Sequence, residues 1–594
     1  MDRLIRNLAF GIALWGTLAP PAASADAPPR TLRVGMPIVT DTLDPARFES
    51  MQAAMLMAGI FDTLYALDPL ARPAAIVPLA AAALPEVSAD FRTFTVRVRP
   101  GTFFTPHRAF GGKPRELTAA DFAYAFKRVV DPKIRSQGLY LVEGKIEGLD
   151  ALAQRGREDG RAFDYDTPVA GLVVVDRMTL RIHLNAPDPI FPFLLTSSLM
   201  GGVAREVVES EGEGFGQHPV GTGAFVATEF APGRRLVLTR NPDFRPLRGD
   251  DLLSPASRAA NASHPLRGMR LPGADRIEFS STPESSAELL ALRRGELDLI
   301  YLNAPELATR DGKLKAELAR DGLRLVRDTM PVSLLSFFSM RDPVVGGDAL
   351  EKIALRRAIQ MAFDDDEWIR VLDAGFSAIR HQVVPPGVDG HLPEYRNPNL
   401  FNPDAANALL DRFGYRRGAD RFRRNPDGSA LTVPVMIGTS SDARKGAEFT
   451  KRMLDRIGLH TAFEAIPGSD RMKRMAHCRF GMATMDWALD IPDGTNPLSM
   501  FWSKGIGSVN MSCYADPVFD AAYEKALVTP PGPARTELFR TMQMRLDAYA
   551  PMRPRPVSDT LLLKRARVVG PFATLNDWLQ VMTLGVDPAA APAR

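Results

Sequence analysis

The sequence predicts an α/β fold, because segments with the period of a strand alternate with segments with the period of a helix. The alternation is clearest where a strand at 276–279 is followed by a helix at 285–294 and a second strand at 297–301. A chain of 594 residues is also long enough for about three to five units of ordinary domain size. Comparable units are expected farther along, with strands at 431–437, 459–466 and 480–485 and helices at 350–363, 403–413 and 444–457.

The first half of the chain carries further signals. Thr118 and Asp121 form a capping box ahead of an apolar helix face that ends before Pro132. A polar turn at 176–178 lies between two alternating segments, which predicts an antiparallel hairpin. The stretch 247–272 is rich in Ser, Ala, Pro and Arg, and we expect an extended surface loop there. The remaining elements expected in this half are strands at 31–36, 91–99 and 235–239 and a helix at 51–65.

The amino terminus predicts export. Arg3 and Arg6 precede an apolar run at 8–19, and Ala23-Ser24-Ala25 has the small-x-small form of a signal-peptidase site. The apolar run is too short for an ordinary membrane span. We therefore expect residues 1–25 to be a signal peptide and the mature protein to lie in the periplasm.

The two cysteines bear on anchoring and on cross-linking. A bacterial lipoprotein needs a cysteine at its cleavage point, and the first cysteine of this chain is Cys478, so we expect no lipid anchor. An even number of cysteines in an oxidising compartment favours a disulfide between Cys478 and Cys513, with two buried free thiols as the alternative. Two cysteines without CxxC spacing exclude a cysteine-rich metal site.

Composition and motifs argue against several classes of function. The net charge is only +3, from 73 basic and 70 acidic residues, which argues against a nucleic-acid partner. The chain contains no HExxH, GxSxG or Walker motif, and its eight histidines lack ligand spacing. The glycines between 209 and 223 do not fit a phosphate-binding loop, and the acidic run at 364–367 fits a helix amino terminus better than a calcium loop. We expect no catalytic residue, cofactor or metal.

The most informative stretch is 485–494, with the sequence MDWALDIPDG. The strand expected at 480–485 leads into this acidic loop, and ligands in α/β sheets gather at the carboxyl ends of strands. An ionised carboxylate such as that of Asp490 needs a cation or several donors when it lies beside apolar surface, and a ligand ammonium is one such cation. The alternative is a surface turn, because Asp, Pro and Gly are common turn residues.

A series of short segments, in their order along residues 31–575, resembles the periplasmic solute-binding proteins of ATP-driven importers. The resemblance is to the peptide, dipeptide and nickel group, bacterial extracellular solute-binding protein family 5. The segments are LDP at 43–45, IFDTL at 60–64, VSADFRTFT at 87–95, RVRPGTFF at 97–104, LTAADF at 117–122, PVGTGAF at 219–225, RNP at 240–242, LRRGELD at 292–298, LRRAI at 355–359 and the loop at 485–494.

The resemblance implies a two-lobed flytrap fold that closes over a ligand, with an additional domain on the first lobe. The units that it implies are residues 26–66, 191–328 and 557–594 in lobe I, residues 67–190 in the additional domain and residues 329–556 in lobe II.

The resemblance also implies a ligand site. In the peptide-binding members, the Asp of a Trp-x-x-Asp loop pairs with the peptide's α-ammonium, and Trp487 and Asp490 hold those positions here. Phe501 and Trp502, with Trp487, are candidate walls of the cleft, and core packing is the alternative for each ring. Ile491 stands where the family often has Tyr or Asn, so an amine is better supported than a peptide. The sequence leaves the partner of a ligand carboxylate open among arginines such as Arg341, Arg356 and Arg380.

The sequence thus predicts a monomeric, non-enzymatic binding component of an ABC importer. It would capture a peptide or peptide-like amine and deliver it to an inner-membrane permease with its ATPase. Within the same fold, the alternatives are a metal chelate, an opine, a glycan fragment or haem as the ligand. Outside transport, the alternatives are an exported hydrolase of peptides or cell-wall fragments and a sensory adaptor.

Overall fold

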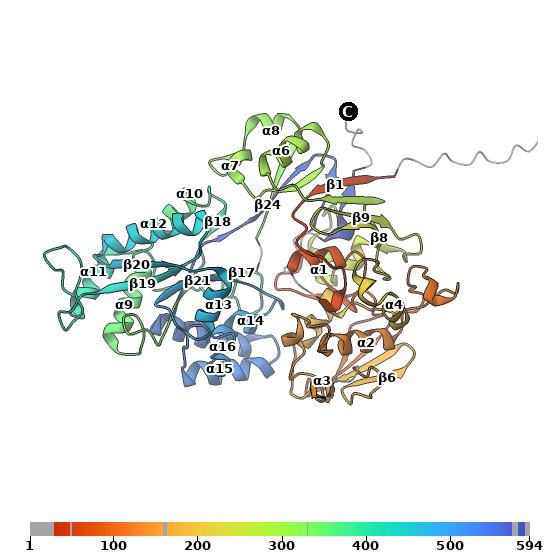
Figure 1. Cartoon of the computed structure of the whole chain (residues 1–594), viewed down its shortest axis with the longest axis horizontal. Coiled ribbons are helices and arrows are strands. Elements are labelled where there is room, and N and C mark those ends of the chain that lie inside the picture. Colours follow the sequence, from red (N-terminus) through yellow and green to blue (C-terminus); the bar gives the residue numbers. More distant parts are fainter. Residues whose placement is uncertain (1–28, 48–49, 159–162, 330, 573–579, 588–594) are drawn as a thin grey trace, which may run out of the picture.

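The computed structural model describes residues 29–47, 50–158, 163–329, 331–572 and 580–587, and within them three main sheets organise the chain. The signal peptide expected at 1–25 lies outside the described residues. Figure 1 shows one body of the molecule built on the five-stranded sheet and a second body that carries the seven-stranded and four-stranded sheets.

The seven-stranded sheet draws its strands from distant parts of the chain. Strand β1 (Thr31–Gly35) pairs in parallel with β12 (Arg276–Ser280) and β13 (Leu299–Tyr301), and its apolar side chains Leu32 and Val34 are buried. The other strands are β8 (Phe225–Ala231), β9 (Arg235–Arg240), β16 (Leu323–Asp328) and β24 (Thr560–Arg565). Helices in the same part of the chain are α1 (Met51–Met57), α4 (Arg205–Glu211), α5 (Pro255–Ala260), α6 (Ser285–Arg294), α7 (Pro305–Ala308) and α8 (Ala316–Arg320).

The four-stranded sheet forms a separate layer near α2 and α3 (Figure 1). Its strands are β4 (Glu86–Val87), β5 (Thr93–Arg97), β6 (Leu172–Asp176) and β7 (Thr179–His183), and β6 and β7 form the expected antiparallel hairpin. Helix α2 (Ala119–Val130) packs on this sheet, and the Asp121 carboxylate accepts a hydrogen bond from the Thr118 backbone N–H at its start. Helix α3 (Leu149–Glu158) packs against α2.

The five-stranded sheet has the order β20-β19-β21-β17-β22. Its strands are β17 (Val332–Phe338), β19 (Thr432–Ile437), β20 (His460–Ala465), β21 (Met482–Ala488) and β22 (Met552–Pro554). Helices of this part of the chain are α9 (Leu350–Met361), α10 (Asp365–Val371), α11 (Pro403–Arg412), α12 (Ser441–Arg456), α13 (Gly468–Ala476), α14 (Thr495–Leu498), α15 (Pro517–Val528) and α16 (Pro533–Tyr549).

The chain passes between the two bodies in two places. One crossing leads from β16 to β17, and the other leads from β22 to β24, which Figure 1 shows running from one body to the other. At the second crossing, the short strand β23 (Val557–Ser558) pairs with β18 (Ser377–Ala378). Two adjacent crossings of this kind permit a hinge motion between the bodies.

Two sequence expectations about local structure are wrong. The helix expected at 51–65 ends at Met57, because the chain turns at Gly59 and continues into β2 (Tyr65–Leu67), which pairs with β3 (Ile76–Pro78). The stretch 247–272 is not one loop, since it contains a short antiparallel pair and α5. The remaining two-stranded pairs are β10 (Leu247–Arg248) with β11 (Arg270–Leu271), β14 (Thr309–Arg310) with β15 (Lys313–Leu314), and β25 (Val568–Val569) with β26 (Gly585–Val586).

Candidate functional site

The loop that carries Asp490 follows the carboxyl end of β21, in the middle of the five-stranded sheet. Strand β21 pairs in parallel with β19 and antiparallel with β17, so its direction is set from both sides. The acidic loop therefore leaves the sheet at the edge where α/β proteins place ligands.

Asp490 faces the other body of the molecule. Its side chain is hydrogen bonded to Tyr140, which lies in a short 3-10 helix, Leu139–Leu141, next to the four-stranded sheet. Burial raises the pKa of Asp490, and the Tyr140 hydrogen bond opposes that rise because it stabilises the ionised carboxylate. The site thus holds a poorly solvated carboxylate at the contact between the two bodies.

A small cavity of about 120 Å³ lies beside Asp490. Asp490 is the charged residue of its lining, and the polar lining residues are Thr63, Thr196, Ser197, Ser198 and Gln580. Most of the remaining wall is apolar and comes from α1, β2 and neighbouring segments, including Met55, Ala58, Phe61, Leu67, Leu79 and Leu141. An apolar cavity with one carboxylate and a few hydroxyls suits a small ligand group that carries a cation at one end.

A wider cleft of about 570 Å³ lies between the two bodies and shares Leu141 with the small cavity. Trp487 and Trp502 line this cleft from the five-stranded body, and Tyr140 and Ile190 line it from the opposite side. The indole N–H of Trp487 donates to Asn496 Oδ1 at 2.9 Å, which fixes the ring. The indole N–H of Trp502 donates to Glu524 Oε1 at 3.1 Å.

Phe501 does not line the cleft. Its side chain is fully buried and packs against Phe337, Tyr514 and Phe519 in the core beside the five-stranded sheet. A role for Phe501 as a wall of the ligand site therefore does not fit this structure. The physical reason is local, because the chain winds through a 3-10 helix, Ser499–Phe501, and leaves it at Trp502 in an extended conformation, so that the two adjacent rings point in different directions.

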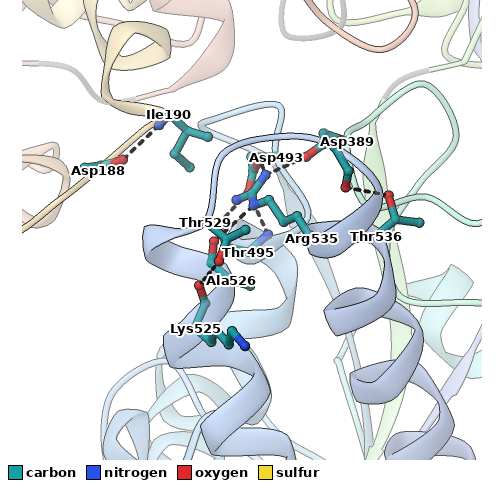
Figure 2. Close-up of polar contacts among 11 residues, drawn as sticks. Asp188, Ile190, Asp389, Asp493, Thr495, Lys525, Ala526, Thr529, Arg535 and Thr536 are labelled. Carbon is teal, nitrogen blue, oxygen red and sulfur yellow. Dashed lines mark hydrogen bonds and ion pairs between the residues drawn. The ribbon is translucent and has the colours of Figure 1, made fainter. Parts of the chain in front are cut away.

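A buried ion cluster holds the far end of the acidic loop (Figure 2). Arg535, at the start of α16, donates from Nη1 to Asp493 Oδ2 at 2.6 Å and from Nη2 to Asp493 Oδ1 at 2.9 Å. The same Nη1 donates to Asp389 at 2.5 Å, and Arg535 Nε donates to the Ala526 carbonyl at 3.0 Å. Asp493 also accepts hydrogen bonds from the backbone N–H and hydroxyl of Thr495. This cluster fixes the backbone three residues after Asp490.

The structure joins Cys478 and Cys513 by a disulfide, with their Cα atoms 6.1 Å apart and a sequence separation of 35. The cross-link ties the start of β21 to the segment that precedes α15. The acidic loop and both tryptophans of the wide cleft lie within the segment that the disulfide closes.

The three arginines left open by the sequence have different surroundings. Arg356 is fully buried and donates to the carbonyls of Val345, Gly347 and Tyr549, so its role is structural. Arg341 lines a groove that Cys478 also lines. Within the part of the chain that the structure describes, Nε and Nη2 of Arg380 are buried without a hydrogen-bond partner, and burial lowers its pKa.

Sequence reasoning missed Tyr140 and Arg535. Tyr140 lies in a segment with no pattern of its own, and Arg535 is one of three arginines in α16 that the sequence does not distinguish. Asp493 was visible as part of the acidic loop, but nothing local indicates that it pairs with a residue 42 positions away.

The described residues contain neither a cluster suited to a metal ion nor a helix suited to a membrane. Across the described residues, no group of three or more His, Cys, Asp and Glu side chains is arranged to hold a metal ion. In the same residues, no helix is long and apolar enough to cross a membrane.

Comparison with known families gives a direct match. The model described as "Bacterial extracellular solute-binding proteins, family 5 Middle" matches residues 75–508. The chain belongs to this family. The two-lobed fold and the family resemblance expected from the sequence are thereby confirmed.

Relatives and solved structures span nearly the whole chain. Di/tripeptide-binding protein 2 of Pseudomonas aeruginosa is 22% identical over 90% of this chain and 90% of its own length. The probable deoxycholate-binding periplasmic protein YgiS of Escherichia coli is 23% identical over 90% of this chain and 89% of its own. The periplasmic binding protein DppA from Helicobacter pylori, solved in complex with the peptide STSA, has a TM-score of 0.67 and 20% identity, and the match covers 94% of this chain and 98% of that one.

Proposed function

We propose that this protein is the substrate-binding component of an ABC importer, which captures a peptide or peptide-like amine between its two lobes and delivers it to a membrane permease. The observation that carries the proposal is the Asp490 carboxylate, which is poorly solvated and faces a small, largely apolar cavity whose other lining residues come from the opposite body. Family membership and the di/tripeptide-binding relative support the same class of ligand.

An ammonium ion is the ligand group that suits Asp490. Burial raises the pKa of this carboxyl, so the ionised form is unfavourable in the ligand-free site. A bound ammonium compensates the lost hydration through a charge-assisted hydrogen bond, and it lowers the pKa again. The bound cation thus stabilises the ionised Asp490 carboxylate, which burial destabilises in the ligand-free site.

Delivery requires a closed state that differs from the ligand-free state. Asp490 comes from lobe II and Tyr140 from the additional domain, so a ligand held at this point contacts both bodies. A ligand that bridges the bodies stabilises their closed arrangement around the two crossing segments, and no catalytic step is needed. The permease then recognises the closed form.

The sheets support the division of the chain into lobe I, an additional domain and lobe II. The seven-stranded sheet uses strands from 31–35, 225–328 and 560–565, the four-stranded sheet uses 86–183, and the five-stranded sheet uses 332–554. We propose boundaries at 26–66, 191–328 and 557–594 for lobe I, 67–190 for the additional domain and 329–556 for lobe II. The working form is a periplasmic monomer without residues 1–25, and its membrane partners are a permease and an ATPase.

A second ligand class follows from the relative named as a probable deoxycholate-binding protein. A bile acid lacks an amine, so it would not use Asp490 as a cation site. Mass spectrometry of ligand that remains bound during purification distinguishes an amine from a steroid acid. The neighbouring genes distinguish an importer from a sensory adaptor, and turnover of a peptide library would reveal a hydrolase.

The test of the proposal is binding of dipeptides to the Asp490→Asn variant by isothermal titration calorimetry. Loss of the charge-assisted bond should weaken binding roughly 10- to 100-fold. Asp486→Asn is the matched control, because Asp486 lies on β21, the strand that leads to Asp490, and has an exposed side chain, so this variant should bind as the parent does. Equal affinity of the parent and Asp490→Asn for dipeptides would refute the cation role, and N-acetylated dipeptides should bind weakly to both.

A further inference from the structure

We propose that the small cavity beside Asp490 takes the side chain next to the ligand's amine, and that it selects a branched aliphatic group the size of that of valine or leucine over an aromatic or charged one. This inference rests on the proposed function, since it assumes that Asp490 binds the amine.

The position of the cavity carries the first step. Asp490 is part of its lining, so a group bonded to the carbon that bears the amine enters the cavity when the ammonium meets the carboxylate. Other parts of the wall are formed by Met55 and Ala58 at the end of α1 and by Leu141 beside Tyr140. The ligand's amine and the side chain next to it would thus be bound by adjoining surfaces of the site.

The size of the cavity carries the second step. Its volume is about 120 Å³. A protein cavity that takes up benzene has a volume of about 150 Å³. The four-carbon side chain of leucine therefore fits, whereas the seven-carbon side chain of phenylalanine or the indole of tryptophan requires the wall to move.

The chemistry of the wall carries the third step. Asp490 is the charged residue of the lining, and most of the wall is apolar. A charged side chain in this space would lose its hydration, and the lining offers it no charged partner besides Asp490, which already binds the ligand's amine. Two buried groups are available to the ligand, because the Ser198 hydroxyl and the Gln580 side-chain oxygen, each on a residue that is 7% exposed, have no hydrogen-bond partner among the described residues. The hydroxyl can bond to a peptide group adjacent to the amine, and the Gln580 oxygen can accept a hydrogen bond from an N–H of the ligand.

Calorimetry with the full mature protein and the dipeptides Leu-Gly, Ala-Gly, Phe-Gly and Gly-Gly tests the preference. Each buried methylene strengthens binding roughly 4-fold, so Leu-Gly should bind roughly 50-fold more tightly than Ala-Gly. Phe-Gly should bind more weakly than Leu-Gly. If Phe-Gly binds as tightly as Leu-Gly, or if Leu-Gly and Gly-Gly bind equally, the cavity does not select the ligand.

Two variants on the wall distinguish a change of cavity from a loss of fold. Ala58→Leu fills the space and should weaken the binding of Leu-Gly at least 10-fold more than the binding of Gly-Gly. Leu141→Ala enlarges the space and should strengthen Phe-Gly binding, and a gain of binding cannot come from misfolding.

The outcomes also separate this inference from the proposed function. If the dipeptides bind and Asp490→Asn weakens them, but Ala58→Leu affects Leu-Gly and Gly-Gly equally, the inference is overturned and the proposed function stands. If the parent protein binds none of the dipeptides, both are overturned.

Discussion

Replacing Arg535 by methionine should lower the stability of lobe II and disturb the acidic loop that carries Asp490. Arg535 is fully buried, and it neutralises Asp493, which is also fully buried, through two hydrogen bonds of 2.6 and 2.9 Å (Figure 2). Methionine fills a similar volume but leaves Asp493 and Asp389 as uncompensated charges. Breaking a buried pair by removing one partner costs about 3 to 5 kcal/mol, because the remaining charge stays out of water.

The consequence for function follows from the position of Asp493. Its carboxylate binds Arg535 and Thr495, and its backbone lies three residues after Asp490. When this anchor is lost, Asp490 must be ordered by the ligand itself, so the affinity for an amine should fall as well as the stability. Adding Asp493→Asn to Arg535→Met should restore part of the stability, because it removes the uncompensated charge.

Denaturant unfolding followed by tryptophan fluorescence and dipeptide calorimetry measure the two effects. Arg540→Met is the matched control on the same helix, since Arg540 is half-buried and its ion pair with the exposed Glu537 at 3.3 Å should contribute at most about 1 kcal/mol. A loss of less than about 1 kcal/mol for Arg535→Met, equal to that of the control, would refute the reasoning.

Three further predictions concern other parts of the molecule. Burial raises the pKa of Glu288 to about 7, so the stability of the parent protein should fall as the pH rises from about 4.5 to 7. Glu288→Gln should be more stable than the parent at pH 8 by up to about 3 kcal/mol and equally stable at pH 4.5. If the melting temperatures of the two proteins change in parallel across this pH range, the prediction is contradicted. Replacing Cys478 and Cys513 by serine should lower the stability of lobe II by about 4 kcal/mol, from the loop closed by a sequence separation of 35, and a reductant should destabilise the parent but leave the variant unchanged. Tyr140→Phe removes a hydrogen bond that lowers the pKa of Asp490, so the pH below which amine binding weakens should rise, and an unchanged pH profile by calorimetry would rule out this role.

Local patterns in the sequence determined much of the architecture. Helix α6 occupies Ser285–Arg294 as its apolar spacing predicts, and the side chain of Asn402 caps α11 by accepting a hydrogen bond from the Ala405 N–H. The acidic loop follows β21, as the strand expected at 480–485 predicts. Such features depend on interactions within a few residues, so the order of residues alone is enough to predict them.

Wrong local expectations arose where packing overrode the pattern. The apolar spacing after α1 continues beyond Met57, but the chain turns at Gly59 so that Ile60 and Phe61 pack into the core of lobe I. A helical apolar period and a buried irregular segment have similar composition, and only the surroundings distinguish them.

The candidate site shows even more clearly which features the sequence predicts and which depend on the tertiary structure. The sequence by itself placed a Trp-x-x-Asp loop at the end of a strand and identified the two cysteines around it. Only the tertiary structure decided that Asp490 meets Tyr140 from the other body, that Asp493 binds Arg535, and that Phe501 is buried in the core. These contacts join segments that are far apart along the chain, and they depend on how the two crossing strands bring the bodies together. No pattern within a single segment carries that information.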